Sequence, residues 1–156
     1  MSPNLKAYLD LLAYSELGPG LLKVSDNGYN VVVGSLPSKP ILFNSYSDHP
    51  RKLVDLGRGL KSTAAGRYQI LSRYFDVYKK QLGLKDFGHD AQDRIAIQMI
   101  SECKALGAIE AGRISEAMKL TNSRWASLPG SPYGQHTNSE KTLLDAFVAA
   151  GGTLTP

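Results

Sequence analysis

The chain has 156 residues, 42% of them hydrophobic, and a formal charge of +4 at pH 7. This suits one compact domain over residues 1–156, or two closely packed lobes around a cleft. The single cysteine, Cys103, excludes an internal disulfide and is expected to be a buried structural thiol. No stretch approaches the length of a membrane span, and Asp10 interrupts any signal-peptide core.

The first predicted element is an amphipathic helix that ends at the Gly-Pro-Gly run of residues 18–20. Ser2 suits its cap and Pro3 its first position. Its apolar stripe consists of Leu5, Leu9 and Leu12, and four residues further this stripe reaches Glu16. Burial on that face and the negative end of the helix dipole both favour a protonated carboxyl group. Such a glutamic acid is a ready general acid, whereas the alternative is a solvated side chain on a frayed helix end.

The remaining elements predict an α+β fold that is mostly helical with a small antiparallel β wing. Residues 28–34 and 41–43 are expected to pair as a hairpin, and residues 47–50 to form a turn. A helix over residues 67–82 should end at Gly83. Its expected core face consists of Leu71, Tyr74, Tyr78 and Leu82. Three later helices are expected, one after Asp90 or Asp93, one over residues 114–120 and one over 140–150.

Charge is concentrated between Arg51 and Lys80, where eight basic residues stand against two acidic ones. A basic patch suits an anionic polymer, although ordinary solvated helix faces carry similar runs. A helix-turn-helix DNA reader is conceivable, but the strongest polar clusters lie in loops with aromatic residues. We therefore expect no nucleic-acid partner and no membrane insertion.

Several kinds of catalytic site are missing from the sequence. The three histidines are scattered, and with one cysteine they make no zinc ligand set, so no metal and no cofactor is expected. No serine-nucleophile elbow and no phosphate-binding glycine loop occurs.

Two segments instead suit sugar binding. Residues 62–69 lead to Tyr68 and Gln69, and residues 125–135 contribute Trp125, Tyr133 and Gln135. Aromatic faces suit pyranose rings, and glutamine amides match hydroxyl and acetamido groups. Tyr68 and Trp125 could equally belong to the core.

Motifs spread over nearly the whole chain resemble the lambda family of phage endolysins. They are Ala13-Tyr-Ser-Glu16, Asn27-Gly-Tyr-Asn30, residues 46–54, 60–69 and 81–87, Trp125-Ala-Ser-Leu-Pro-Gly130 and Tyr133-Gly-Gln135. The resemblance implies a lysozyme-like fold with a cleft between two lobes. It also implies a lytic transglycosylase that cleaves the β-1,4 bond between N-acetylmuramic acid and N-acetylglucosamine in peptidoglycan. It places the catalytic acid at Glu16 and substrate contacts at Gln69 and Tyr133. The chain departs from the family in residues 17–24 and 36–43.

By the same resemblance, a monomeric enzyme would wait in the host cytoplasm until a phage holin opens the inner membrane, and would then act in the periplasm. Two alternatives stay open, a hydrolytic muramidase or chitinase-like enzyme and a cell-wall-binding module without turnover. A hydrolase generally needs a second carboxylate, for which Asp48 is the nearest candidate. In Asp48-His-Pro50, however, that side chain is better interpreted as a turn residue that bonds backbone amides. Asp48 is also counted among the expected substrate contacts. Arg67 could be a brace or a substrate-binding cation.

Overall fold

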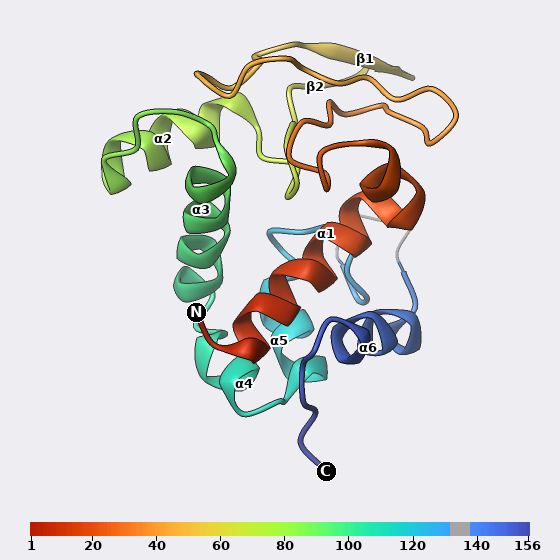
Figure 1. Cartoon of the computed structure of the whole chain (residues 1–156), viewed down its shortest axis with the longest axis vertical. Helices are drawn as coiled ribbons and strands as arrows, with labels where there is room; N and C mark the ends of the chain where they lie inside the picture. Colours follow the sequence, from red (N-terminus) through yellow and green to blue (C-terminus); the bar gives the residue numbers. More distant parts are fainter. Residues whose placement is uncertain (132–137) are drawn as a thin grey trace. The chain divides into compact units, whose positions relative to one another are not determined.

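The computed structural model describes residues 1–131 and 138–156, and Figure 1 shows its elements. The chain forms two compact units, the first made of residues 1–16 and 96–156 and the second of residues 17–95. The helices are α1 (Pro3–Val24), α2 (Ser72–Leu82), α3 (His89–Glu102), α4 (Leu106–Glu110), α5 (Ile114–Thr121) and α6 (Glu140–Ala149). The strands are β1 (Val54–Gly57) and β2 (Leu60–Ser62). The predicted α+β class is confirmed, and the prediction of one domain stays a prediction.

Helix α1 begins at the predicted cap, because the Leu5 amide donates to the Ser2 hydroxyl at 3.1 Å. Gly18, with φ 77°, interrupts the helix where its end was predicted, but a short helical stretch follows the break. Tyr8 and Leu11 are fully buried outside the predicted stripe, so the helix is covered on more than one face. Within the described residues, no helix combines the length and apolarity needed to span a membrane.

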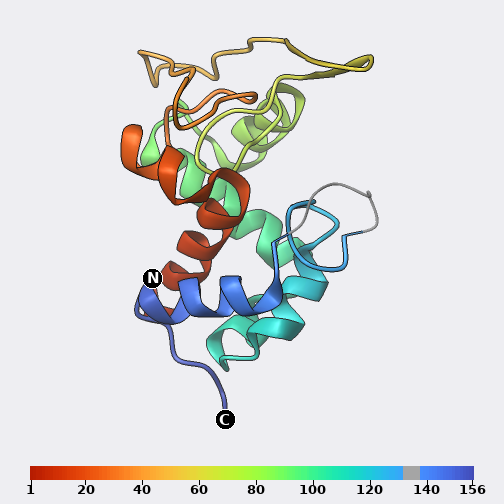
Figure 2. The same cartoon turned by 90° about the vertical axis from the view of Figure 1, so that its right-hand side faces the viewer.

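The first unit packs α4, α5 and α6 with the beginning of α1. The Asn4 amide donates to the carbonyl of Ile109 at 2.9 Å and accepts from the Thr153 amide at 2.9 Å. These bonds join the start of α1 to the segment that follows α6, and Figure 2 shows that segment leading from α6 to the C-terminus. Ser139 caps α6 by accepting from the Thr142 amide at 3.2 Å.

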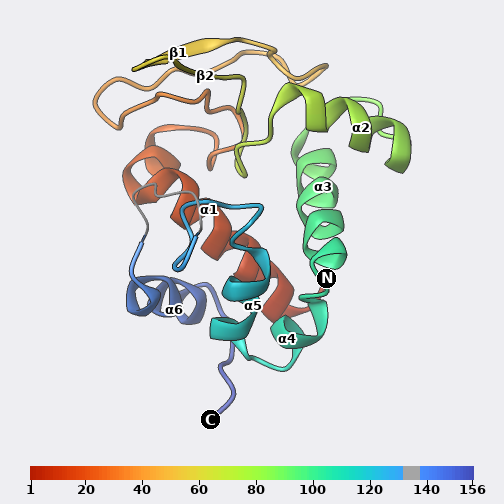
Figure 3. The same cartoon turned by 180° about the vertical axis from the view of Figure 1, so that it is seen from behind.

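The second unit contains the sheet, but at a different place from the predicted hairpin. Strands β1 and β2 pair antiparallel through a turn with positive φ at Gly57, Arg58 and Gly59 (Figure 3). The predicted runs do approach each other, since the Val32 amide donates to the Ile41 carbonyl at 2.8 Å. They form only isolated bridges rather than strands. The prediction of a hairpin over residues 28–34 and 41–43 was therefore wrong in position.

Helix α2 begins at Ser72, five residues later than predicted, because the preceding residues form a turn. Its buried residues are Phe75 and Tyr78, whereas Tyr74 is 45% exposed. The prediction therefore placed Tyr74 in the core, whereas its neighbour Phe75 is the residue that is buried there. The predicted end is confirmed, because Gly83 takes the left-handed conformation and its neighbour Leu84 donates to the carbonyl of Lys79.

Candidate functional site

Glu16 lies near the end of the first part of α1, two residues before the break at Gly18. The residue keeps some solvent contact, but its carboxyl group is enclosed by protein. This burial raises the pKa of Glu16 from 4.5 to about 7, and a hydrogen bond from the Ser127 hydroxyl opposes part of the rise. The carboxyl group can therefore hold its proton close to neutral pH and release it on demand.

This pKa predicts how activity should depend on pH. A raised pKa keeps Glu16 protonated below about pH 7 and ionised above it. If the protonated form is the active one, turnover should fall about tenfold for each pH unit above that point. The measurement is the initial rate on purified peptidoglycan between pH 5 and 9. A flat profile across this range would contradict a perturbed acid.

Gln69 occupies a tight turn in the second unit, between Gly66 and the start of α2. Ala65 and Ile70 close the turn by exchanging backbone hydrogen bonds at 3.1 and 2.9 Å. Gln69 itself has φ 52°, a left-handed conformation that costs a non-glycine residue about 1–2 kcal/mol. Its Nε2 donates to the Gly66 carbonyl at 2.8 Å, which fixes the amide and directs its Oε1 away from that bond. Strain of this kind is often found at functional positions.

Tyr68 points into the core of the second unit, with 1% of its surface exposed. Its hydroxyl donates to the carboxylate of Asp93 at 2.6 Å and accepts from the Arg67 guanidinium at 2.9 Å. Arg67 also donates to the Asn27 carbonyl at 3.0 Å and stacks on the rings of Tyr29 and Tyr68. Arg67 is therefore a structural brace, which the sequence could not decide. The geometry favours the same role for Tyr68, and its contact with substrate stays a prediction.

The other predicted sugar contacts fall in the 125–135 segment. Trp125 is 1% exposed, which agrees with the core interpretation rather than an open aromatic face. Tyr133 and Gln135 lie outside the described residues, so their predicted roles stay predictions. The segment does contain a residue that the sequence did not single out, Ser127, which reaches Glu16. A lone serine in a loop has no periodic pattern that could have revealed it.

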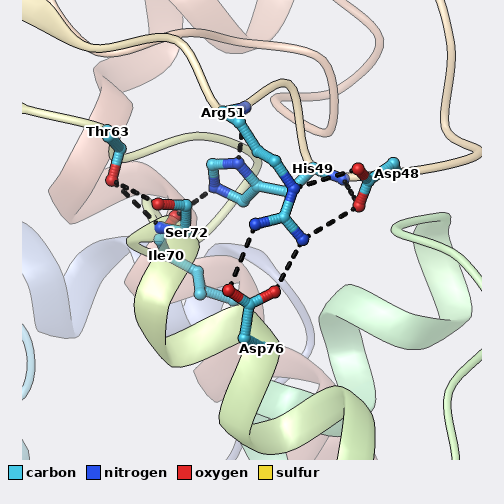
Figure 4. Close-up of polar contacts among 7 residues, drawn as sticks. All are labelled: Asp48, His49, Arg51, Thr63, Ile70, Ser72 and Asp76. Carbon is cyan, nitrogen blue, oxygen red and sulfur yellow. Dashed lines mark hydrogen bonds and ion pairs between the residues drawn. The ribbon is translucent and has the colours of Figure 1, made fainter.

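Asp48 lies in the second unit, in the cluster that Figure 4 shows. Both its carboxylate oxygens accept hydrogen bonds from Arg51, at 3.0 and 3.2 Å, and one also accepts from the His49 amide at 2.8 Å. Arg51 in turn bonds Asp76 through two nitrogens. The hydrogen bonds from Arg51 hold the pKa of Asp48 below its usual value. This geometry is what the turn interpretation predicts, and a substrate contact by Asp48 stays a prediction.

His49 is buried in the same cluster and has a structural role. Its Nδ1 accepts from the Arg51 amide at 2.9 Å, so its Nε2 carries the proton that is donated to the Ile70 carbonyl at 2.8 Å. Burial lowers the pKa of His49, in keeping with this neutral form. With both nitrogens bonded, His49 is no metal ligand. Across residues 1–131 and 138–156 no group of three or more metal-binding side chains is found.

Comparison with known proteins decides the family. The endolysin family model matches residues 6–154. The endolysin of Escherichia phage lambda is 51% identical over 150 residues, covering 96% of this chain and 92% of the relative. The endolysin of Escherichia phage P2 is 46% identical over 154 residues, covering 96% of this chain and 93% of the relative. The chain belongs to the endolysin family.

Solved structures agree with this assignment. The lambda lysozyme complexed with a chitohexasaccharide matches this endolysin with a TM-score of 0.92 and 49% identity, covering 99% of this chain and 98% of the other. A second structure of lysozyme from bacteriophage lambda gives a TM-score of 0.89 and 48% identity over the same shares. The lysozyme-like fold predicted from the motifs is confirmed. The protein is a lysozyme-like endolysin, an enzyme of the glycosidase type that degrades peptidoglycan.

Proposed function

We propose that this endolysin is a lytic transglycosylase in which Glu16 serves first as acid and then as base. The bond cleaved joins N-acetylmuramic acid to N-acetylglucosamine in peptidoglycan strands. The observation that carries the proposal is the enclosed Glu16 carboxyl group, whose pKa burial raises to about 7. A group that titrates near the working pH can both give and take a proton without a large cost in either direction.

The reaction needs no water. Glu16 donates its proton to the glycosidic oxygen as the bond from that oxygen to the anomeric carbon of muramic acid breaks. N-acetylglucosamine leaves with the proton as a hydroxyl group, and positive charge develops on the muramic acid. The C6 hydroxyl of the same sugar then attacks the anomeric carbon and gives its proton to the Glu16 carboxylate. A 1,6-anhydro ring closes, and Glu16 is protonated again.

A hydrolase in the same fold would usually need a second carboxylate, to activate water or to form a covalent intermediate. Asp48 is the candidate from the sequence, and Arg51 and the His49 amide engage both of its oxygens. A carboxylate with this many donors is a weaker base and a weaker nucleophile. This arrangement supports the transglycosylase over the hydrolytic muramidase.

Membership of the endolysin family supports a proposal about the substrate and the setting. A relative with a TM-score of 0.92 was solved with a chitohexasaccharide, which supports a glycan strand as the substrate of this chain too. We propose that the enzyme acts as a monomer on periplasmic peptidoglycan, after a phage holin has let it out of the host cytoplasm. Gram-negative cells that contain the enzyme in their cytoplasm should then keep their turbidity while the inner membrane is intact. Their turbidity should fall rapidly once the inner membrane is permeabilised.

Reducing ends test the reaction type. A transglycosylase should solubilise peptidoglycan without producing new borohydride-reducible ends, because the anhydro ring locks the anomeric carbon. A hydrolytic muramidase, assayed in parallel, should produce one new reducing end for each bond cleaved. Equal numbers of reducing ends and cleaved bonds with this enzyme would replace the proposal by the hydrolase.

Gln69→Ala is expected to lower turnover by roughly tenfold, because a substrate-positioning contact is lost while Glu16 is untouched. Tyr133→Ala should have a similar effect. The matched control is Gln81→Ala, which removes an exposed glutamine from α2 in the same unit. The measurement is the initial rate on purified peptidoglycan together with the melting temperature. Wild-type rates in both variants would remove these two residues from the substrate site.

Asp48→Asn should keep most of the activity, because the proposed reaction uses one carboxyl group only. Exposed ion pairs contribute about 1 kcal/mol or less, so stability should change little. Asp76→Asn removes the other carboxylate partner of Arg51 and controls for the loss of that pairing. Loss of turnover in Asp48→Asn alone, with Asp76→Asn unaffected, would favour the hydrolytic muramidase.

A further inference from the structure

A chain of hydrogen bonds within the first unit ends at the Glu16 carboxyl group. We propose that Ser127, Ser15 and Asn138 are positioning residues that act through this chain to stabilise the carboxylate form of Glu16 between its two proton transfers. The inference rests on the proposed role of Glu16 as acid and base. It adds three residues to the catalytic apparatus, none of which is expected to touch the sugar.

The links from Asn138 to Ser127 are short. The Asn138 Nδ2 donates to the backbone carbonyl of Ser15 at 3.0 Å and to its hydroxyl at 3.2 Å. The Ser15 and Ser127 hydroxyls lie 2.7 Å apart. The Ser127 hydroxyl in turn bonds the carboxyl group of Glu16. The chain therefore runs from the segment before α6, through α1, to the loop after α5 and back to α1.

Hydrogen-bonding capacity gives this chain one direction. A carboxylate only accepts, so the Ser127 hydroxyl must donate its single proton to an ionised Glu16. Ser127 must then accept from Ser15, whose own proton is available because Asn138 donates to it. The amide orientation of Asn138 is fixed as well, since the Ser15 carbonyl can accept only from a nitrogen. Every donor thus points toward Glu16 when Glu16 is charged.

The neighbouring structure holds the chain in place. Ser127 lies between Trp125 and Leu128, which are 1% and 0% exposed. The Leu128 amide donates to the Trp125 carbonyl at 3.1 Å, and the Asn138 amide donates to the Ser127 carbonyl at 3.0 Å. Asn138 therefore holds Ser127 through its backbone and Ser15 through its side chain. Fixed donors of this kind stabilise a developing charge without reorganising at the moment of reaction.

The chemical consequence concerns the intermediate stage of the reaction. After its first proton transfer, Glu16 is an ionised group in an enclosed site, where burial disfavours the charge. The Ser127 hydrogen bond is the compensating contact. Burial and this bond are the two influences on the Glu16 pKa, and among the described residues no charged neighbour adds to them. Without the bond, the carboxyl group should release its proton less readily.

The test is a carbon-13 NMR titration of the labelled Glu16 carboxyl group in the full chain. In Ser127→Ala we expect its pKa to rise by about one pH unit, as the loss of a hydrogen bond to a charged group predicts. Ser15→Ala should give a smaller rise, because Ser127 keeps its own proton but loses its donor. The double variant should match Ser127→Ala, since Ser15 reaches Glu16 only through Ser127. In all three, the decline of turnover with pH should move with the titration.

Ser139→Ala is the matched control, because it removes another serine hydroxyl from the first unit by deleting the cap of α6. It should lower the melting temperature and leave the titration of Glu16 where it was. Ser127→Thr, which keeps the hydroxyl, should restore the wild-type titration. An unchanged Glu16 titration in Ser127→Ala, or additive changes in the double variant, would overturn the inference. The titration requires no turnover, so it can fail or succeed independently of the product analysis that tests the proposed function.

Discussion

Glu16→Gln is expected to lower turnover on peptidoglycan by at least about a thousandfold, within the range for removal of a general acid. The amide keeps the shape of the carboxyl group but has no proton to transfer and no base to regenerate. The measurement is solubilisation of purified peptidoglycan over long incubations. Substantial residual turnover would move the acid to another residue. Glu140→Gln, at an exposed position in the first turn of α6, should leave the rate unchanged.

The same substitution should stabilise the protein in a pH-dependent way. The pKa of Glu16 is about 7 in the folded chain against 4.5 as its ordinary value, so the unfolded state releases the proton first. The free energy of unfolding of the wild type therefore falls as pH rises from about 4.5 to about 7, by an upper limit of roughly 3 kcal/mol. Glu16→Gln removes this loss. The variant should match the wild type at pH 4.5 and melt at a higher temperature at pH 8.

Equal melting temperatures for the two proteins at pH 8 would contradict a pKa raised by burial. They would not by themselves remove Glu16 from catalysis, because an acid with an ordinary pKa can still donate a proton. The rate and the stability of one variant therefore report on separate parts of the account, the role of the group and its environment.

Gly66→Ala is expected to destabilise the second unit by roughly 3–5 kcal/mol. Gly66 has φ 85°, and a Cβ there would overlap the Oε1 of Gln92 and lie 2.9 Å from its Cδ. Gln92 is fully buried and bonds the Arg67 amide, the Tyr29 carbonyl and the Phe87 carbonyl. The substitution therefore adds backbone strain and disrupts buried hydrogen bonds, each worth about 1–3 kcal/mol when left unsatisfied. Chemical denaturation monitored by circular dichroism measures the loss.

Gly83→Ala separates the two contributions. Gly83 also has a positive φ, 66°, but a Cβ there meets nothing within 4 Å. It should cost only the backbone strain, about 1–2 kcal/mol. Equal losses for the two variants would show that Gln92 is not held against Gly66 as described. Because Gly66 is in the turn that orients Gln69, its variant should also lose activity at temperatures where it remains folded.

Local signals in the sequence predicted the parts of the fold that depend on neighbouring residues. The Ser2 cap, the break at Gly18 and the end of α2 at Gly83 each follow from one residue type at one position. The sheet was misplaced because Val31 and its neighbours look more like a strand than residues 54–57 do. In the structure, however, Val31 and its neighbours form only isolated β-bridges and no strand. The strands that do form carry exposed leucines, Leu56 and Leu60, without the usual alternation.

In the candidate site, too, local sequence signals revealed some residues, whereas others depend on contacts between distant parts of the chain. Glu16 could be identified from the sequence because it is a charged residue on the apolar face of a predicted helix, which the spacing of neighbouring residues reveals. Its partners could not, because Ser127 and Asn138 lie more than a hundred residues from Ser15 along the chain. The start of α2 was predicted too early for a related reason. Tyr68 is held by Asp93, 25 residues away, in a turn that overrides its helical pattern.

The most direct test of the central claim is mass spectrometry of muropeptides released in water enriched in heavy oxygen. If Glu16 works alone and the C6 hydroxyl is the nucleophile, the released ends should be 1,6-anhydro-N-acetylmuramic acid. These ends are lighter by one water than hydrolytic products and should carry no heavy oxygen. Glu16→Gln should release neither kind of end. Reducing ends that carry heavy oxygen would contradict the account, because they would show that water, not the substrate, attacks the anomeric carbon.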